Sequence, residues 1–68
     1  MSKCIQLPSG RIVNIDDIIY ISNPKYSKSS NEWSFDITWA YRIVESLNYL
    51  YKDVLELDRN ELIKNIMQ

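Results

Sequence analysis

Carboxylates are the side chains in this sequence that could perform acid–base chemistry. Histidine, the commonest general base, is absent from the 68 residues, which removes Ser-His and Cys-His nucleophile pairs. Asp16-Asp17 has the composition of a turn, and Asp58 has the spacing of a helix cap. Asp36 and Glu45 could face each other across a hairpin, where their repulsion would require a nearby Lys or Arg. The pattern predicts no catalytic centre, so we expect the protein not to be an enzyme.

Metal and cofactor sites are not predicted either. Cys4 is the single cysteine, and without histidine it cannot complete a zinc ligand set. Gly10 is the single glycine, and one glycine cannot build a phosphate-binding loop or an EF-hand. We interpret Cys4 as a small, partly buried side chain. No metal and no cofactor are therefore expected.

Aromatic residues are the most informative group for binding. Two Trp, five Tyr and one Phe exceed what the core of so short a chain needs. Large amphipathic rings can simply cover a small core, but Tyr, Trp and Arg also dominate binding hot spots. Trp33, Phe35 and Ile37 alternate on one side of a segment and are expected to be core. The predicted binding surface comprises Tyr20, Tyr26, Trp39, Tyr41, Arg42 and Tyr49.

The size and charge of the chain restrict its partners. A chain this short folds as a single domain, residues 1–68, and buries only about 60% of its unfolded surface. Since disulfides and metals are excluded as supports, oligomerisation or a protein partner is the remaining route to extra stability. Eight basic and nine acidic residues give a net charge of −1. Nucleic-acid-binding proteins usually carry a basic patch, so this balance argues against nucleic-acid binding. No membrane span and no secretory segment is present, so we expect a cytoplasmic protein.

Local patterns predict short strands followed by a helix. Pro8 and Gly10 suit a type I turn followed by a left-handed residue, which predicts a hairpin. Alternating or β-branched residues predict strands, and polar residues 25–31 predict a loop. The predicted strands lie at residues 4–7, 11–15, 18–22 and 32–39.

Residues 40–57 have two interpretations. At helical spacing, apolar residues from Ala40 to Leu55 form one continuous face, which predicts an amphipathic helix. Alternatively, the chain turns at residues 40–42, returns as a strand and begins a helix near Lys52. The turn lacks Gly, Asn and Asp, which disfavours the strand interpretation. The helical interpretation requires the preceding strand to run directly into a helix, which is uncommon. Both interpretations give an α+β fold, a small antiparallel sheet (hairpin or meander) packed against a C-terminal helix.

Three segments resemble small uncharacterised proteins of phages and prophages in low-GC bacteria. They are Leu7-Pro8-Ser9-Gly10-Arg11-Ile12-Val13-Asn14-Ile15-Asp16, Ile19-Tyr20-Ile21-Ser22 and Leu57-Asp58-Arg59-Asn60-Glu61-Leu62-Ile63-Lys64. The resemblance covers nearly the whole chain and implies a strand-turn-strand course for residues 33–48. Its motifs are structural, so it implies no functional residue. It implies an inhibitor or anti-defence role.

The leading hypothesis is a non-enzymatic interaction protein. It would bind a protein partner or itself, as a homo-oligomer, through an aromatic surface or by adding a strand to a sheet edge. A first alternative is a nucleotide-binding or nucleotide-sequestering oligomer, in which Lys25, Lys28 and Arg42 meet phosphates. A second alternative is a dimeric DNA-binding regulator.

Overall fold

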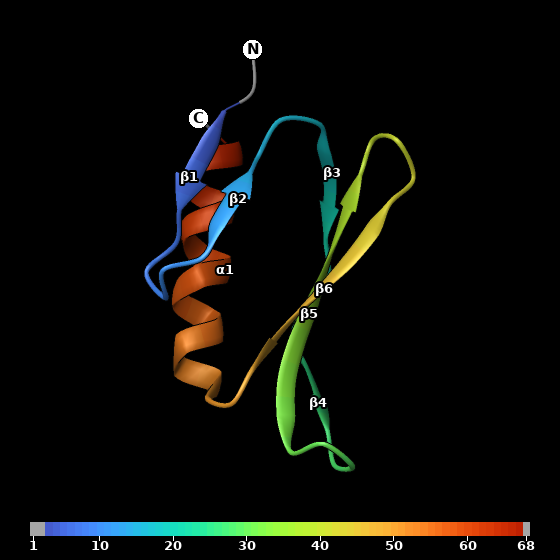
Figure 1. The fold of residues 1–68 in the computed structure, drawn as a ribbon, viewed down its shortest axis with the longest axis vertical. Helices are drawn as coiled ribbons and strands as arrows, with labels where there is room; N and C mark the ends of the chain where they lie inside the picture. The colour runs from blue at the N-terminus through green and yellow to red at the C-terminus, as the bar shows by residue number, and fades with distance from the viewer. Residues whose placement is uncertain (1–2, 68) are drawn as a thin grey trace.

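The computed structural model describes residues 3–67, which form six strands followed by one helix (Figure 1). The α+β prediction, an antiparallel sheet with a C-terminal helix, is confirmed. The elements are β1 (Cys4–Gln6), β2 (Ile12–Asn14), β3 (Ile18–Ile21), β4 (Lys25–Ser27), β5 (Glu32–Trp39), β6 (Val44–Tyr49) and α1 (Lys52–Ile66).

Strand β5 is the centre of a four-stranded antiparallel sheet. β6 pairs along one edge of β5, while β3 and β4 pair one after the other along the opposite edge. Pro24 lies between β3 and β4, where its missing N–H interrupts no ladder. The prediction of a loop at residues 25–31 is wrong for Lys25–Ser27, because β5 offers this polar segment a free edge to pair with. β1 and β2 form a separate hairpin beside the helix (Figure 1).

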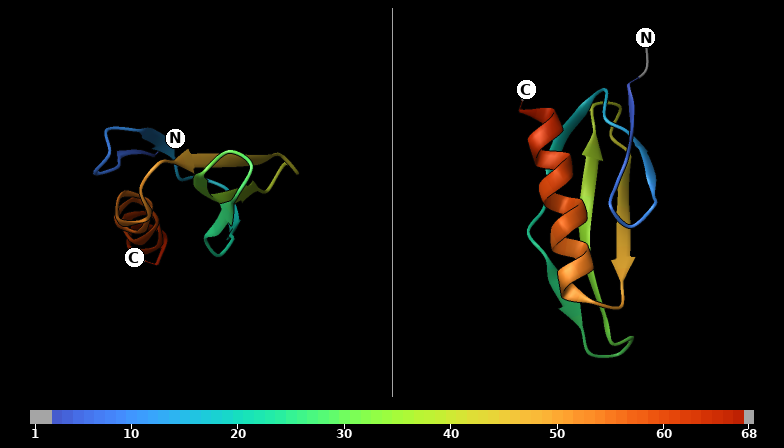
Figure 2. Two further views of the ribbon diagram at one scale, coloured as in Figure 1. Left: turned by 90° about the horizontal axis from the view of Figure 1, so that it is seen from below. Right: turned by 90° about the vertical axis from the view of Figure 1, so that its left-hand side faces the viewer.

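The core lies between the sheet and the helix. Alternation along β5 directs Phe35, Ile37 and Trp39 towards α1, and all three are buried. Leu55 and Leu62 of α1 are fully buried against them. Figure 2 shows the helix on this one side, so the opposite face of the sheet is open. The additional core residues are Leu7, Val13, Ile15, Leu47 and Tyr49.

Residues 44–49 are a strand, and the helix begins only at Lys52. The chain reverses between β5 and β6 through Arg42, which adopts the left-handed conformation with φ 68°. The same turn joins β1 to β2, where Gly10 has φ 101° and its N–H donates to Leu7 O at 2.8 Å. The matching bond in the second turn runs from Arg42 N–H to Trp39 O at 2.9 Å. Both hairpins therefore use one turn geometry, although only the first contains the residue that this geometry favours.

Replacing Arg42 by glycine is expected to stabilise the protein by about 0.5–1 kcal/mol. A left-handed residue with a Cβ costs roughly 1–2 kcal/mol, and part of the gain is offset by the greater freedom of glycine in the unfolded chain. Urea denaturation measures the change. Gly10→Ala is the matched control and should destabilise the protein, because alanine is strained at the positive φ of Gly10. A Cβ there meets no atom within 4 Å, so the destabilisation is conformational and not steric. A destabilised Arg42→Gly variant would contradict this explanation of the turn.

Helix α1 has no side-chain cap at its start. Tyr51 occupies the N-cap position without a side-chain hydrogen bond. The prediction that Asp58 caps a helix is wrong, because Asp58 lies inside α1 and is completely buried. Its spacing of three from Leu55 and four from Leu62 places it on the helix face that packs against the sheet.

Candidate interaction surface

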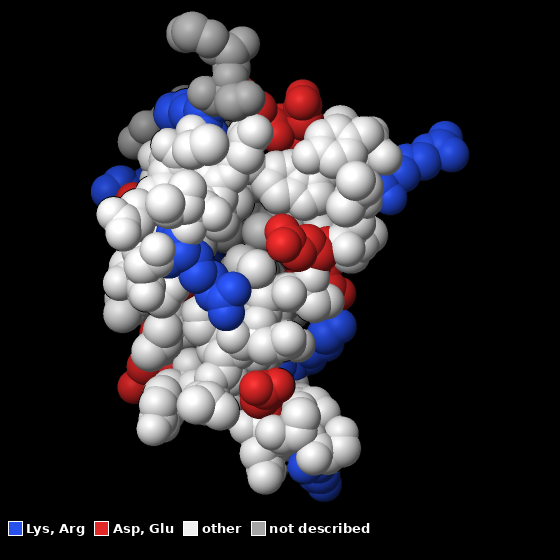
Figure 3. Space-filling view, viewed as in Figure 1, with Lys and Arg blue, Asp and Glu red and all other residues white. Residues whose placement is uncertain are grey.

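A groove of about 630 Å³ lies between the β1–β2 hairpin and β6. We call it the β2–β6 groove. Buried apolar side chains form its floor, namely Val13, Trp39 and Leu47. Its rim is apolar but exposed, at 73% for Ile12, 58% for Tyr41, 54% for Ile43 and 60% for Val44. The face that contains the hairpin and the β5–β6 turn is dominated by uncharged atoms (Figure 3).

Apolar residues gather at this rim because of the topology. Ile12 comes from β2, whereas Tyr41, Ile43 and Val44 come from the β5–β6 turn and the start of β6. Tyr41 stacks on Trp39 with the ring centroids 6.2 Å apart and the planes within 11°. The rim is thus held over the floor by an aromatic pair. Clustered exposed apolar side chains of this kind mark interaction sites more often than scattered ones do.

Arg11 spans the groove at one end. Its guanidinium donates to Asn48 O of β6 at 2.8 Å and lies 4.9 Å from the centroid of the Tyr49 ring. The guanidinium therefore links the hairpin to β6 by a hydrogen bond and a cation–π contact. Glu45 is the other charged residue that lines the groove.

A buried carboxylate fixes the hairpin beside the helix. Asp58 accepts hydrogen bonds from Ser9 N at 2.9 Å, from the Ser9 hydroxyl, and from the Tyr49 hydroxyl at 2.6 Å. Burial, and then this hydrogen bond, raise the pKa of Tyr49 above its ordinary value of 10.0. Asp58 of α1 is thereby bonded to the β1–β2 turn and to β6. These bonds fix the position of the β1–β2 hairpin, which forms one wall of the groove.

The structure does not bring the six predicted surface residues together. Tyr41 and Trp39 line the β2–β6 groove, but Trp39 is buried in its floor. Tyr49 is also buried, so its predicted place on the binding surface is wrong. The helical interpretation put Tyr49 off the apolar face, but residues 44–49 form a strand, whose alternation turns Leu47 and Tyr49 towards α1. Arg42 is exposed in the β5–β6 turn.

The other two predicted residues lie elsewhere. Tyr20 pairs with Thr38 on the open face of the sheet, and Tyr26 of β4 contacts Trp33 with the centroids 5.1 Å apart. Sequence reasoning missed Ile12, Ile43 and Val44. The helical interpretation placed Ile43 and Val44 on the continuous apolar face, and Ile12 comes from a strand far from them in the chain.

The cations expected for a nucleotide site are also dispersed. Lys25 forms an ion pair with Asp36 at 3.1 Å. Lys28 and Arg42 lie in the turns at opposite ends of β5. The geometry therefore gives no shared phosphate site to these three side chains.

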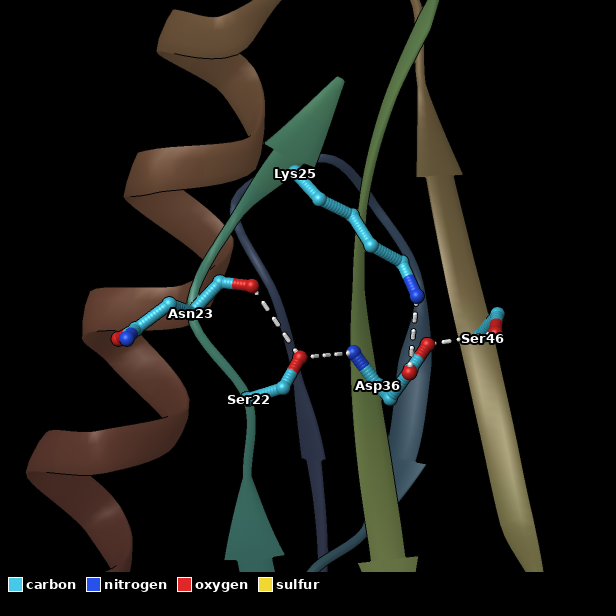
Figure 4. Close-up of polar contacts among 5 residues, drawn as sticks. All are labelled: Ser22, Asn23, Lys25, Asp36 and Ser46. Carbon is cyan, nitrogen blue, oxygen red and sulfur yellow. Dashed lines mark hydrogen bonds and ion pairs between the residues drawn. The ribbon is translucent and has the colours of Figure 1, made fainter. Parts of the chain in front are cut away.

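A polar cluster occupies the open face where β3 ends and β4 begins (Figure 4). Ser46 donates to Asp36 at 2.6 Å and Ser22 Oγ accepts from Asp36 N at 2.8 Å. The hydrogen bonds from Ser46 and Lys25, together with the charge of Lys25, hold the pKa of Asp36 below its ordinary value of 3.8. The register pairs Asp36 with Ser46 and not with Glu45, so the predicted repulsion between Asp36 and Glu45 does not arise, and among the described residues Lys25 pairs with Asp36 alone. These contacts tie three strands together and leave no free acid–base pair.

Other candidate chemistry is limited in the same way. Cys4 is exposed, which corrects the expectation of partial burial. Within residues 3–67, no three His, Cys, Asp or Glu side chains gather as a metal ligand set. The one helix of the described chain is too short and too polar to cross a membrane.

Comparison of the chain with protein-family models, with curated proteins and with solved structures found no match. The candidate site therefore stands on its own geometry.

Proposed function

We propose that this chain is a non-enzymatic protein-binding domain and that the β2–β6 groove is its binding surface. The observation that carries the proposal is the exposed apolar rim around an apolar floor. More than half of each rim side chain is exposed, namely those of Ile12, Tyr41, Ile43 and Val44. Burying this apolar surface against a partner would contribute favourable free energy to binding. The two charges at the groove, Arg11 and Glu45, are opposite in sign, which favours a protein partner over a polyanion.

Replacing Ile43 by aspartate is expected to weaken partner binding strongly. The substitution places a charge at the apolar rim, and desolvating that charge opposes association. The measurement is affinity purification from the native host with the tagged full chain, followed by titration of the captured protein against the purified variants. We expect the Kd to rise at least tenfold, which is about 1.4 kcal/mol.

Leu57→Asp is the matched control. Leu57 is 59% exposed on α1 and does not line the groove, so the same change there should leave binding intact. Equal loss of binding in both variants would contradict the assignment of the surface. Retention of binding by Ile43→Asp would also contradict it.

A further inference from the structure

We infer that the partner occupies the β2–β6 groove as an extended strand inserted between β2 and β6. The inserted segment belongs to a different polypeptide and is unpaired before it binds. This inference rests on the proposed function, because it names how the same groove is filled.

The β6 wall presents main-chain groups that β5 does not use. Trp39 N–H donates to Ile43 O at 2.8 Å, and residues of an antiparallel pair exchange hydrogen bonds at every second position. The alternation therefore directs the N–H and C=O groups of Val44, Ser46 and Asn48 away from β5. Asn48 O accepts from Arg11, whereas no described residue bonds the outward main-chain groups of Val44 or Ser46.

The β2 wall is open in the same way. Leu7 N–H donates to Arg11 O at 2.7 Å, and Ile15 N–H donates to Lys3 O at 2.8 Å. The alternation between these two bonds directs the main-chain groups of Ile12 and Asn14 away from β1. Two strand edges with main-chain donors and acceptors that no residue among 3–67 uses, Asn48 O apart, thus border one groove, and the group that satisfies both edges is a polypeptide main chain.

The walls are far enough apart to admit a strand. Hydrogen-bonded neighbours have Cα atoms about 4.5–5.5 Å apart, and β2 and β6 are not paired in either sheet. Nearly all Cα separations between β2 and β6 exceed 8 Å. The two walls are therefore not close enough to pair with each other, and a strand inserted between them would join the hairpin and the four-stranded sheet into a continuous sheet.

A second copy of this chain does not fit the role. An inserted strand needs both of its edges free, because it pairs with β2 on one side and β6 on the other. Every strand within the described part of the chain is already paired along at least one edge. The occupant is therefore a segment that has no strand partner of its own.

The floor determines the side chains of the occupant. Successive residues of a strand point to opposite faces, so every second side chain would contact Val13, Trp39 and Leu47. The occupant should carry apolar residues at alternate positions. Proline is excluded where the occupant's N–H must pair.

The test begins with a random library of short linear peptides selected against the full chain. The selected peptides should show alternating apolar residues, and the titrations use one of them as the probe. Ser46→Pro removes the outward N–H of β6 without breaking the β5–β6 ladder and should weaken binding about tenfold or more. Ser46→Ala removes the hydroxyl that bonds Asp36 but keeps the N–H, and it should bind the probe as the wild type does.

A second measurement does not depend on the folding of Ser46→Pro. N-methylation of a central residue in the probe should abolish binding, whereas N-methylation of its terminal residue should not. If the probe binds Ile43→Asp as tightly as wild type, the groove assignment and the proposed function fail together. If binding needs Ile43 but tolerates central N-methylation, strand insertion is overturned and the proposed function stands. Failure to select any peptide also overturns strand insertion.

Discussion

Replacing Asp58 by alanine is expected to destabilise the protein by about 3 kcal/mol or more. Asp58 is 0% exposed and accepts three hydrogen bonds, two from Ser9 and one from Tyr49. Hydrogen bonds to charged groups contribute about 1.5–3 kcal/mol each, and donors left unpaired in the interior add a desolvation cost. A domain of this length has a total stability of roughly 3–10 kcal/mol, so the variant should be close to unfolded. Urea denaturation followed by circular dichroism measures the loss.

Asp53→Ala is the appropriate control for Asp58→Ala. Asp53 lies in the first turn of the same helix and is exposed, so its removal should change the free energy of unfolding by less than about 1 kcal/mol. Asp58→Asn keeps the shape but only one of the two acceptor oxygens, and should fall between the wild type and Asp58→Ala. A loss below 1 kcal/mol for Asp58→Ala would mean that the hairpin is held by its apolar contacts alone.

Stability is expected to fall steeply above pH 10 because of Tyr49. The folded-state pKa of Tyr49 is raised above the ordinary 10.0, so below pH 10 both states keep the proton and Tyr49 gives no pH dependence. Above pH 10 the unfolded chain releases the proton while the folded chain retains it, which removes about 1.4 kcal/mol for each further pH unit. Thermal melts at increasing pH measure this slope.

Tyr49→Phe should lower stability at neutral pH, since Asp58 loses a hydrogen bond, but should flatten the slope above pH 10. The near-ultraviolet absorbance of tyrosinate gives a second reading. The pKa of Tyr49 is raised, so its tyrosinate signal should develop only as the chain unfolds. Ionisation of Tyr49 near pH 10 while the chain remains folded would contradict its buried position.

Sequence patterns predicted the central strand well because β5 is half-buried. One face of β5 meets α1 and the other meets solvent, so Phe35 and Ile37 alternate with polar residues and the period is visible. Residues 40–57 fitted both the helical period of 3.6 and the strand period of 2, because their apolar residues are closely spaced. Arg42 decided the outcome, and its left-handed conformation could not be predicted from an arginine that has no intrinsic preference for it.

The candidate site was predictable only in part. Tyr41 and Trp39 were identified because aromatic residues are informative by type. Ile12 and Val44 became site residues through topology, which joins segments more than thirty positions apart in the printed sequence. Asp58 gave one usable signal, its place between Leu55 and Leu62 on an apolar face, but its resemblance to a helix cap obscured that signal.

The contact between Ser9 and Asp58 also has a consequence for the order of assembly during synthesis. The two residues are 49 positions apart, whereas the β1–β2 hairpin needs only its own neighbouring residues to form. The hairpin can therefore pair early on the ribosome, but it gains its seat on the helix only after Asp58 has been translated. Asp58 follows Tyr49, the last residue of β6, by only nine positions. The interval in which β6 has been translated but the hairpin is not yet fixed beside the helix is therefore short, and the β6 edge has little time to pair with a neighbouring chain.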